Sequence, residues 1–176
     1  MVATSTYLIV FRIVHILAGV AWAGSSFLFV GFIGPAASEI GPAAGPLMAN
    51  LVEKRKVTNV IEGTASFTVL AGLFLYWHDW HAVGSFGDWI GTRFGLVLTI
   101  GGVAAIIAFF LGTFGIKPSV ERMVALGGEM AASGGPPAPE LMGEMQPLQG
   151  RLKVIGQADL AFLAIAILGM ATARYW

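Results

Sequence analysis

The stretch RIVHILAGVAWAGSSF, residues 12–27, lies inside a long apolar run and yet carries an arginine, a histidine, a tryptophan and two serines. At helical spacing, five of its residues recur every three or four positions and so share one face: Arg12, His15, Gly19, Trp22 and Ser26. An ionisable group in a membrane helix is costly, so it normally faces the interior of a bundle and marks function. The stretch therefore predicts a membrane helix with one functional face.

The composition places the whole chain in a lipid bilayer. Of its 176 residues, 56% are hydrophobic and only 11% are charged, whereas soluble domains carry roughly 25% charged residues. The formal net charge is zero, which argues against a nucleic-acid partner. The chain has no cysteine, and this excludes disulfides, thiolate metal sites and c-type haem attachment.

Four apolar segments are long enough to cross a membrane, at about residues 10–34, 57–77, 89–115 and 154–174. They predict one all-α domain over residues 1–176, a polytopic protein built as an antiparallel four-helix transmembrane bundle. Residues 116–153 form a cytoplasmic connection. The first segment is expected to be a retained helix and not a cleaved signal, because Arg12 and His15 lie inside the apolar run.

The connections carry more local signals. The Gly/Pro/Ala-rich residues 34–45 predict a connector, and Pro46 predicts the start of a helix that passes through Lys54-Arg55-Lys56. Residues 119–132 predict a short amphipathic helix, residues 133–137 a break, and Pro139 the return of helix.

Basic residues are distributed unevenly between the two ends of the expected bundle. Seven of them flank the first and third connections: Lys54, Arg55, Lys56, Lys117, Arg122, Arg151 and Lys153. By the positive-inside rule these connections face the cytoplasm. The sequence therefore predicts a multi-pass protein of the bacterial inner membrane with both termini outside.

The three histidines are expected to gather near the outer face. His15 lies near the start of the first span, while His78 and His81 follow the end of the second. Imidazole is a common metal and axial haem ligand, and a guanidinium such as that of Arg12 pairs with a carboxylate such as a haem propionate. Trp22 is a candidate to pack on the porphyrin face.

Three interpretations of this outer cluster stay open. Haem b held by His15, Arg12 and Trp22 is the first, with a second ligand from the outer loop or from water. Copper or another metal held by His15, His78 and His81 is the second. In the third, no cofactor binds, and His15 is a buried polar residue hydrogen-bonded across the bundle.

A second polar cluster is expected toward the cytoplasmic side. It comprises Glu62 on the second span with Lys153, Gln157 and Asp159 on the fourth, of which Lys153 and Gln157 share a face while Asp159 points elsewhere. The simple interpretation is an ion pair that fixes the register of the helices, since an unpaired charge there is costly. The alternative is a proton relay or a polar contact with the edge of a haem.

The pattern Arg12-x-x-His15-Ile16-x-x-Gly19-x-x-Trp22-x-Gly24-x-x-Phe27 resembles the first membrane helix of a loose bacterial superfamily. Its members include the copper-resistance D membrane proteins, the membrane domain of the membrane-anchored urate oxidase and the membrane-type protoporphyrinogen oxidase. The chain is most similar to the small uncharacterised membrane proteins related to these. Pro139-Glu140, Gly150-Arg151 and the ending Met170-Ala171-x-Ala173-Arg174-Tyr175 are similar to that group as well.

The resemblance implies that His15 is the helix-one histidine of the superfamily. In the haem-synthesis branch that histidine is associated with haem or porphyrin together with a lysine on the third helix, whereas here Arg93 and Lys117 only flank the third span. The resemblance thus supports haem or metal binding at His15 without identifying a reaction. The leading hypothesis is a haem-associated electron-transfer component. The alternatives are a copper-handling protein and a cofactor-free accessory subunit, in a homo-oligomer or a larger membrane complex.

Overall fold

The computed structural model describes residues 6–136 and 138–176, and in that part of the chain every regular element is a helix. Four helical stretches there are long and apolar enough to cross a membrane: Thr6–Lys54, Val57–Val83, Arg93–Ala132 and Pro139–Tyr175. The predicted all-α class is confirmed, and four apolar helices fit a multi-pass membrane protein in a lipid bilayer.

The first stretch is helical well beyond its predicted end. α1 (Thr6–Leu28) continues through the π-helical turn η1 (Phe29–Ile33) into α2 (Gly34–Ile40). The chain then reverses at Gly41, whose φ of 70° breaks the helix, and returns through η2 (Gly41–Ala44), α3 (Gly45–Ala49) and η3 (Asn50–Lys54). The expected connector is therefore helical. Each of its prolines lies in the first turn of a helix, where no backbone N–H is needed.

The second span begins at Val57, as the sequence predicted, but it is a helix separate from the one that precedes it. A helix does start around Pro46, but it ends at Lys54, and Lys56 is left-handed with φ of 53°. The prediction that this helix passes through the basic cluster is wrong, because a left-handed residue cannot continue a right-handed helix. α4 (Val57–Val83) starts directly after this turn and extends six residues past its predicted end at 77.

The third span is preceded by a separate short helix. α5 (Phe86–Gly91) is capped by Ser85, and α6 (Arg93–Leu111) is capped by Thr92, whose hydroxyl accepts from the amide of Gly95. The predicted start at 89 therefore falls in α5. α6 continues through η4 (Gly112–Ile116) into α7 (Lys117–Ala132), which confirms the expected amphipathic helix.

The last helix turns back along the third. Residues 133–136 form the predicted break, whose last residue, Pro137, lies outside the described residues. α8 (Pro139–Thr172) then runs uninterrupted to η5 (Ala173–Tyr175). At 1.5 Å per residue α8 is about 51 Å long, longer than the roughly 30 Å hydrocarbon core, so part of the α7–α8 hairpin extends beyond the membrane.

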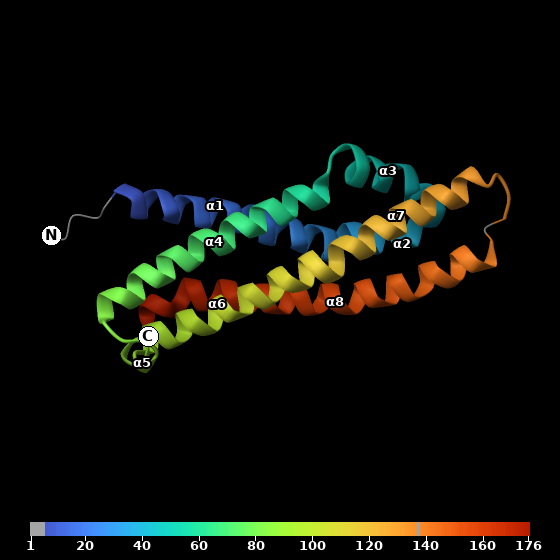
Figure 1. The fold of residues 1–176 in the computed structure, drawn as a ribbon. Coiled ribbons are helices and arrows are strands. Elements are labelled where there is room, and N and C mark those ends of the chain that lie inside the picture. The colour runs from blue at the N-terminus through green and yellow to red at the C-terminus, as the bar shows by residue number, and fades with distance from the viewer. Residues whose placement is uncertain (1–5, 137) are drawn as a thin grey trace.

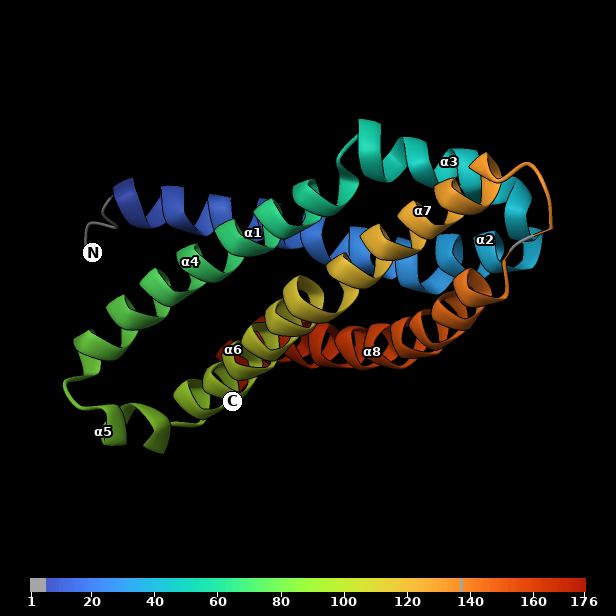
Figure 2. The same ribbon diagram turned by 45° about the vertical axis from the view of Figure 1, so that its right-hand side comes forward.

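The four long helices alternate in direction and pack most closely as the pairs α1 with α4 and α6 with α8 (Figure 1). A core layer of Trp22, Ala65, Ala108 and Leu163 takes one residue from each of these helices. α2, α3 and α7 lie together at one end of the bundle, while α5 and the C-terminus lie at the other (Figure 2). Large apolar side chains on the outer faces, such as Leu17 and Val20, are exposed as a lipid contact requires.

Candidate functional site

His15 lies on the face of α1 that packs against α4, and its imidazole is partly buried. Its Nδ1 is 2.8 Å from the backbone carbonyl oxygen of Thr68. A carbonyl oxygen only accepts, so Nδ1 carries the hydrogen and donates it. This bond selects the tautomer in which Nε2 keeps its lone pair, the state in which a histidine binds a metal.

Two glycines let the helices approach closely enough for this contact. A Cβ placed on Gly72 would lie 2.8 Å from Cε1 and 3.0 Å from Nδ1 of His15, so the ring occupies the space that any larger residue would fill. On the other helix, a Cβ on Gly19 would meet the methyl group of Thr68 at 3.4 Å. The orientation of the imidazole is thus built into the backbone of both helices.

Aromatic rings fill the α1–α4 interface between His15 and the end that carries α5. Phe11 stacks on Phe74 with ring centroids 4.1 Å apart, and Tyr7 packs edge-on against Phe74 and His78. Arg12, one turn from His15, is exposed. A guanidinium in that position is available to an external carboxylate.

The structure separates His15 from the other two histidines. Since Tyr7 lies opposite His78, His15 is two turns further along α1 and reaches the level of Gly72, not the end of α4. Along α4, His78 follows Thr68 by ten residues, or roughly 15 Å of helix. The expectation that all three histidines gather at one level is therefore wrong.

His78 and His81 have local partners of their own. Nδ1 of His78 is 3.3 Å from Asp79, and Nδ1 of His81 is 3.1 Å from the carbonyl oxygen of Trp77. Within residues 6–136 and 138–176, no three His, Asp or Glu side chains group closely enough to hold a metal ion.

Trp22, the residue predicted to pack on the porphyrin face, lies deep in the bundle. Its side chain is 4% exposed and packs with Ala65, Ala108 and Leu163 in the core layer. Because this layer is two turns along α1 from His15, Trp22 supports the packing of the four helices and does not line the space next to the imidazole.

The four residues of the predicted inner cluster do not lie together in the structure. Glu62 pairs with Lys117 at the start of α7, a partner that sequence reasoning missed. Lys153 and Gln157 are exposed on the outer surface of α8, whose main packing partner is α6. Asp159 points elsewhere, as predicted, and is buried. In the sequence, the signal for Lys117 as this partner is its position: Lys117 ends the third apolar run, at the same end of the bundle as Glu62.

A second ion pair ties the α7–α8 hairpin together. Nε and Nη2 of Arg122 donate to the two carboxylate oxygens of Glu144 at 2.6 and 2.7 Å, and Nη1 donates to Glu129 at 3.0 Å. These hydrogen bonds hold the pKa of the exposed Glu144 carboxyl below its usual value and raise that of Arg122.

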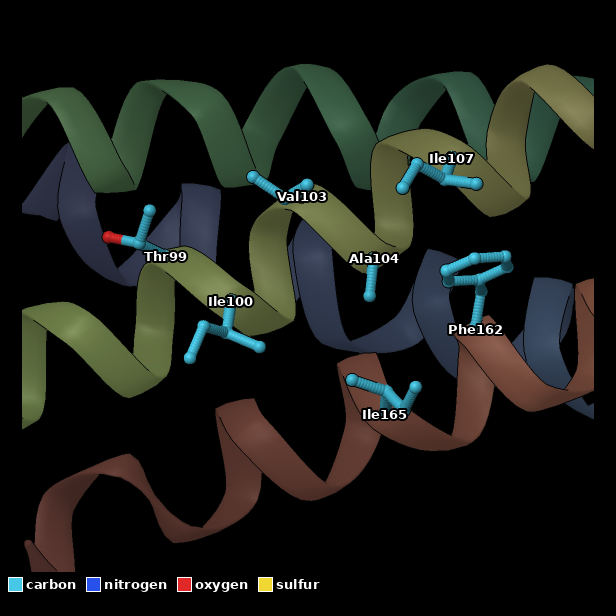
Figure 3. A pocket seen from close by; sticks show the side chains of 7 residues that line it. All are labelled: Thr99, Ile100, Val103, Ala104, Ile107, Phe162 and Ile165. Carbon is cyan, nitrogen blue, oxygen red and sulfur yellow. The ribbon is translucent and has the colours of Figure 1, made fainter.

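Two cavities lie away from His15. One is an apolar groove of about 310 Å³ between α6 and α8, lined by residues such as Val103, Ala104 and Phe162 (Figure 3). The other, of about 150 Å³, lies between the start of α4 and α7, where Thr58 donates to Glu121 at 2.9 Å. Neither is lined by His15.

Comparison with known proteins gives no match to a protein-family model, a curated protein or a solved structure. The assignment of function therefore depends on the geometry of the site.

Proposed function

We propose that this protein is a haem-associated electron-transfer component of a bacterial inner membrane, with His15 as the axial ligand. The observation that supports the proposal is the hydrogen bond from Nδ1 of His15 to the Thr68 carbonyl. Axial and metal-ligating histidines characteristically donate their second ring nitrogen to a backbone carbonyl or a carboxylate. The resemblance of the first helix to the superfamily points to the same residue.

The residues present fit one axial ligand, and each contributes in a definable way. His15 offers Nε2, while the Thr68 carbonyl fixes the orientation of the ring. Gly72 keeps the imidazole against the α4 backbone. Arg12, one turn away and exposed, is placed to pair with a propionate. When bound, haem supplies the one-electron change, and the chain supplies the ligand, the burial and the charge.

The distribution of charge supports an orientation. Lys54, Arg55 and Lys56 lie at the end of the bundle that carries α2, α3 and α7, and so do Lys117 and Arg122. We place this end in the cytoplasm and both termini outside. His15 then lies in the outer half of the first span.

A cofactor-free accessory subunit is the second candidate. The Thr68 hydrogen bond also satisfies His15 within the bundle, and the apolar groove between α6 and α8 offers a surface to another membrane helix in a homo-oligomer or a larger complex. The copper interpretation is not carried further, because His15, His78 and His81 occupy separate positions.

Visible spectra of the detergent-purified protein, expressed with an ample haem supply, distinguish the two candidates. We expect a Soret band and sharp reduced bands in the wild type, lost in His15→Ala and kept in His78→Ala. The same featureless spectrum from the wild type and from both variants would reject haem binding and favour the accessory subunit.

A further inference from the structure

Asp159 is the most deeply buried residue of an ionisable type among the described residues, and one of its carboxyl oxygens has no hydrogen-bond partner there. Its side chain is 1% exposed, and Oδ1 makes no hydrogen bond. No ion pair to Asp159 exists among the described residues. An isolated carboxylate in such surroundings is strongly unfavourable, because it loses its hydration and gains no opposite charge. An aspartate at this position therefore needs a compensating charge.

The packing of α1 on α8 locates this carboxyl in the middle of the bundle. Trp22 shares the core layer with Leu163, and Val30 lies 3.0 Å from the position of a Cβ on Gly156. The helices are antiparallel (Figure 1), so Ser26, midway between Trp22 and Val30, is level with Asp159. Ser26 is buried as well.

The same layer locates the titratable groups on the other helices. Ala65 is level with Leu163, and α4 runs in the same direction as α8, so Glu62 lies at the level of Asp159. Glu62 is already neutralised by Lys117. α1 carries no titratable side chain within two turns of this level, and the continuation of α6 into α7 carries only Lys117 there, which pairs with Glu62. Among the described residues, no basic group is therefore left to balance a charge on Asp159.

The backbone around Asp159 departs from regular α-helix. Val30 belongs to η1, and Gly115, whose Cβ position is 3.1 Å from Ile155, belongs to η4. Two π-helical turns thus flank the segment of α8 that leads into Asp159. Such turns are rare and are frequent at functional sites.

We propose that Asp159 is a proton-binding site inside the membrane, whose carboxyl takes up and releases a proton in the interior of the bundle. The ligand is a proton because a single carboxyl beside one serine offers too few ligands for Mg²⁺ or Ca²⁺, which take six or more, or for Zn²⁺, which takes four. Binding forms one O–H bond on the carboxylate and cancels its charge. This site is independent of any cofactor at His15.

Infrared spectroscopy of the full-length protein in liposomes tests the proposal. A protonated carboxyl has a C=O stretch that is distinct from the carboxylate bands and shifts in D2O. We expect such a band at neutral pH, corresponding to one carboxyl per chain. It should shift on transfer to D2O and disappear reversibly as the pH is raised. Asp159→Asn should remove it, whereas Glu62→Gln and Asp79→Asn should keep it.

Two results would overturn the proposal. One is the absence of an Asp159-dependent band at neutral pH, which would mean that the carboxyl is charged. The other is a band that neither exchanges with D2O nor titrates over the range in which the protein stays folded, which would mean that Asp159 is a fixed structural group. If Asp159→Asn does not fold, dicyclohexylcarbodiimide, which modifies protonated carboxyls in apolar surroundings, replaces it as the wild-type probe. Peptide mapping then supports the proposal if Asp159 is labelled and rejects it if Asp159 is not.

Discussion

Substitution of Gly72 by alanine tests the packing that orients His15. The new Cβ would lie 2.8 Å from Cε1 and 3.0 Å from Nδ1 of the imidazole, closer than real Cβ contacts allow. Overpacking of this kind costs about 1–3 kcal/mol, and loss of the bond to Thr68 adds about 0.5–1.5 kcal/mol. The higher helix propensity of alanine returns about 0.5–1 kcal/mol. We expect a net destabilisation of about 2 kcal/mol, within a range of about 0.5–4 kcal/mol.

Unfolding in mixed micelles, followed by circular dichroism, measures this loss. Gly63→Ala on the same helix is the matched control, because a Cβ there meets nothing within 4 Å; it should be neutral or slightly stabilising. The Gly72 penalty should largely vanish in a His15→Ala background, as a double-mutant cycle reveals. Equal stability of the Gly72→Ala and Gly63→Ala proteins would refute the packing of His15 on Gly72.

Three further predictions concern the contacts between helices. Pairing with Arg122 lowers the pKa of Glu144 in the folded protein below its usual 4.5. The contribution of this ion pair to stability is therefore fully present above pH 4.5 and is lost as the pH falls through the lower folded pKa. Amide hydrogen exchange in α7 should become faster over that acidic range, and Glu144→Gln should remove this pH dependence. Gly169→Ala would place a Cβ 3.1 Å from the Cα of Gly101 and should destabilise the protein by about 1–3 kcal/mol. Gly102→Ala, where a Cβ meets open space, should not destabilise it. Equal melting curves for the two variants would contradict the close α6–α8 contact. Glu62→Gln should destabilise by about 1–2 kcal/mol, between the values for exposed and buried pairs, and a cycle with Lys117→Gln that shows no coupling would argue against the pair.

Hydropathy predicted the four spans because burial in lipid demands long apolar runs whatever the details of packing. The helical path through α2 and α3 was not predictable in the same way. The prolines at 35 and 42 indicate a loop by composition, but each lies in the first turn of a helix, where proline is tolerated.

The sequence predicted individual residues of the candidate site but not how they lie relative to one another. The spacing on α1 predicted a face that carries His15, and His15 does pack against α4. The level of His15 on α4 depends on the packing of Tyr7 against His78, which no periodicity reveals. Similarly, the spacing on α8 separated Asp159 from Lys153 and Gln157, as the structure shows. The pairing of Glu62 with Lys117 depends on a long side chain that bridges two helices.

Haem titration of the purified apoprotein tests the central claim most directly. Haem is added in steps to the wild type, His15→Ala and the matched control His81→Ala, and the absorbance of bound haem is followed to saturation. We predict saturation at one haem per chain in the wild type and in His81→Ala, with at least a tenfold loss of affinity in His15→Ala, about 1.4 kcal/mol. Identical titration curves for the wild type and His15→Ala would contradict the role of His15 as the axial ligand.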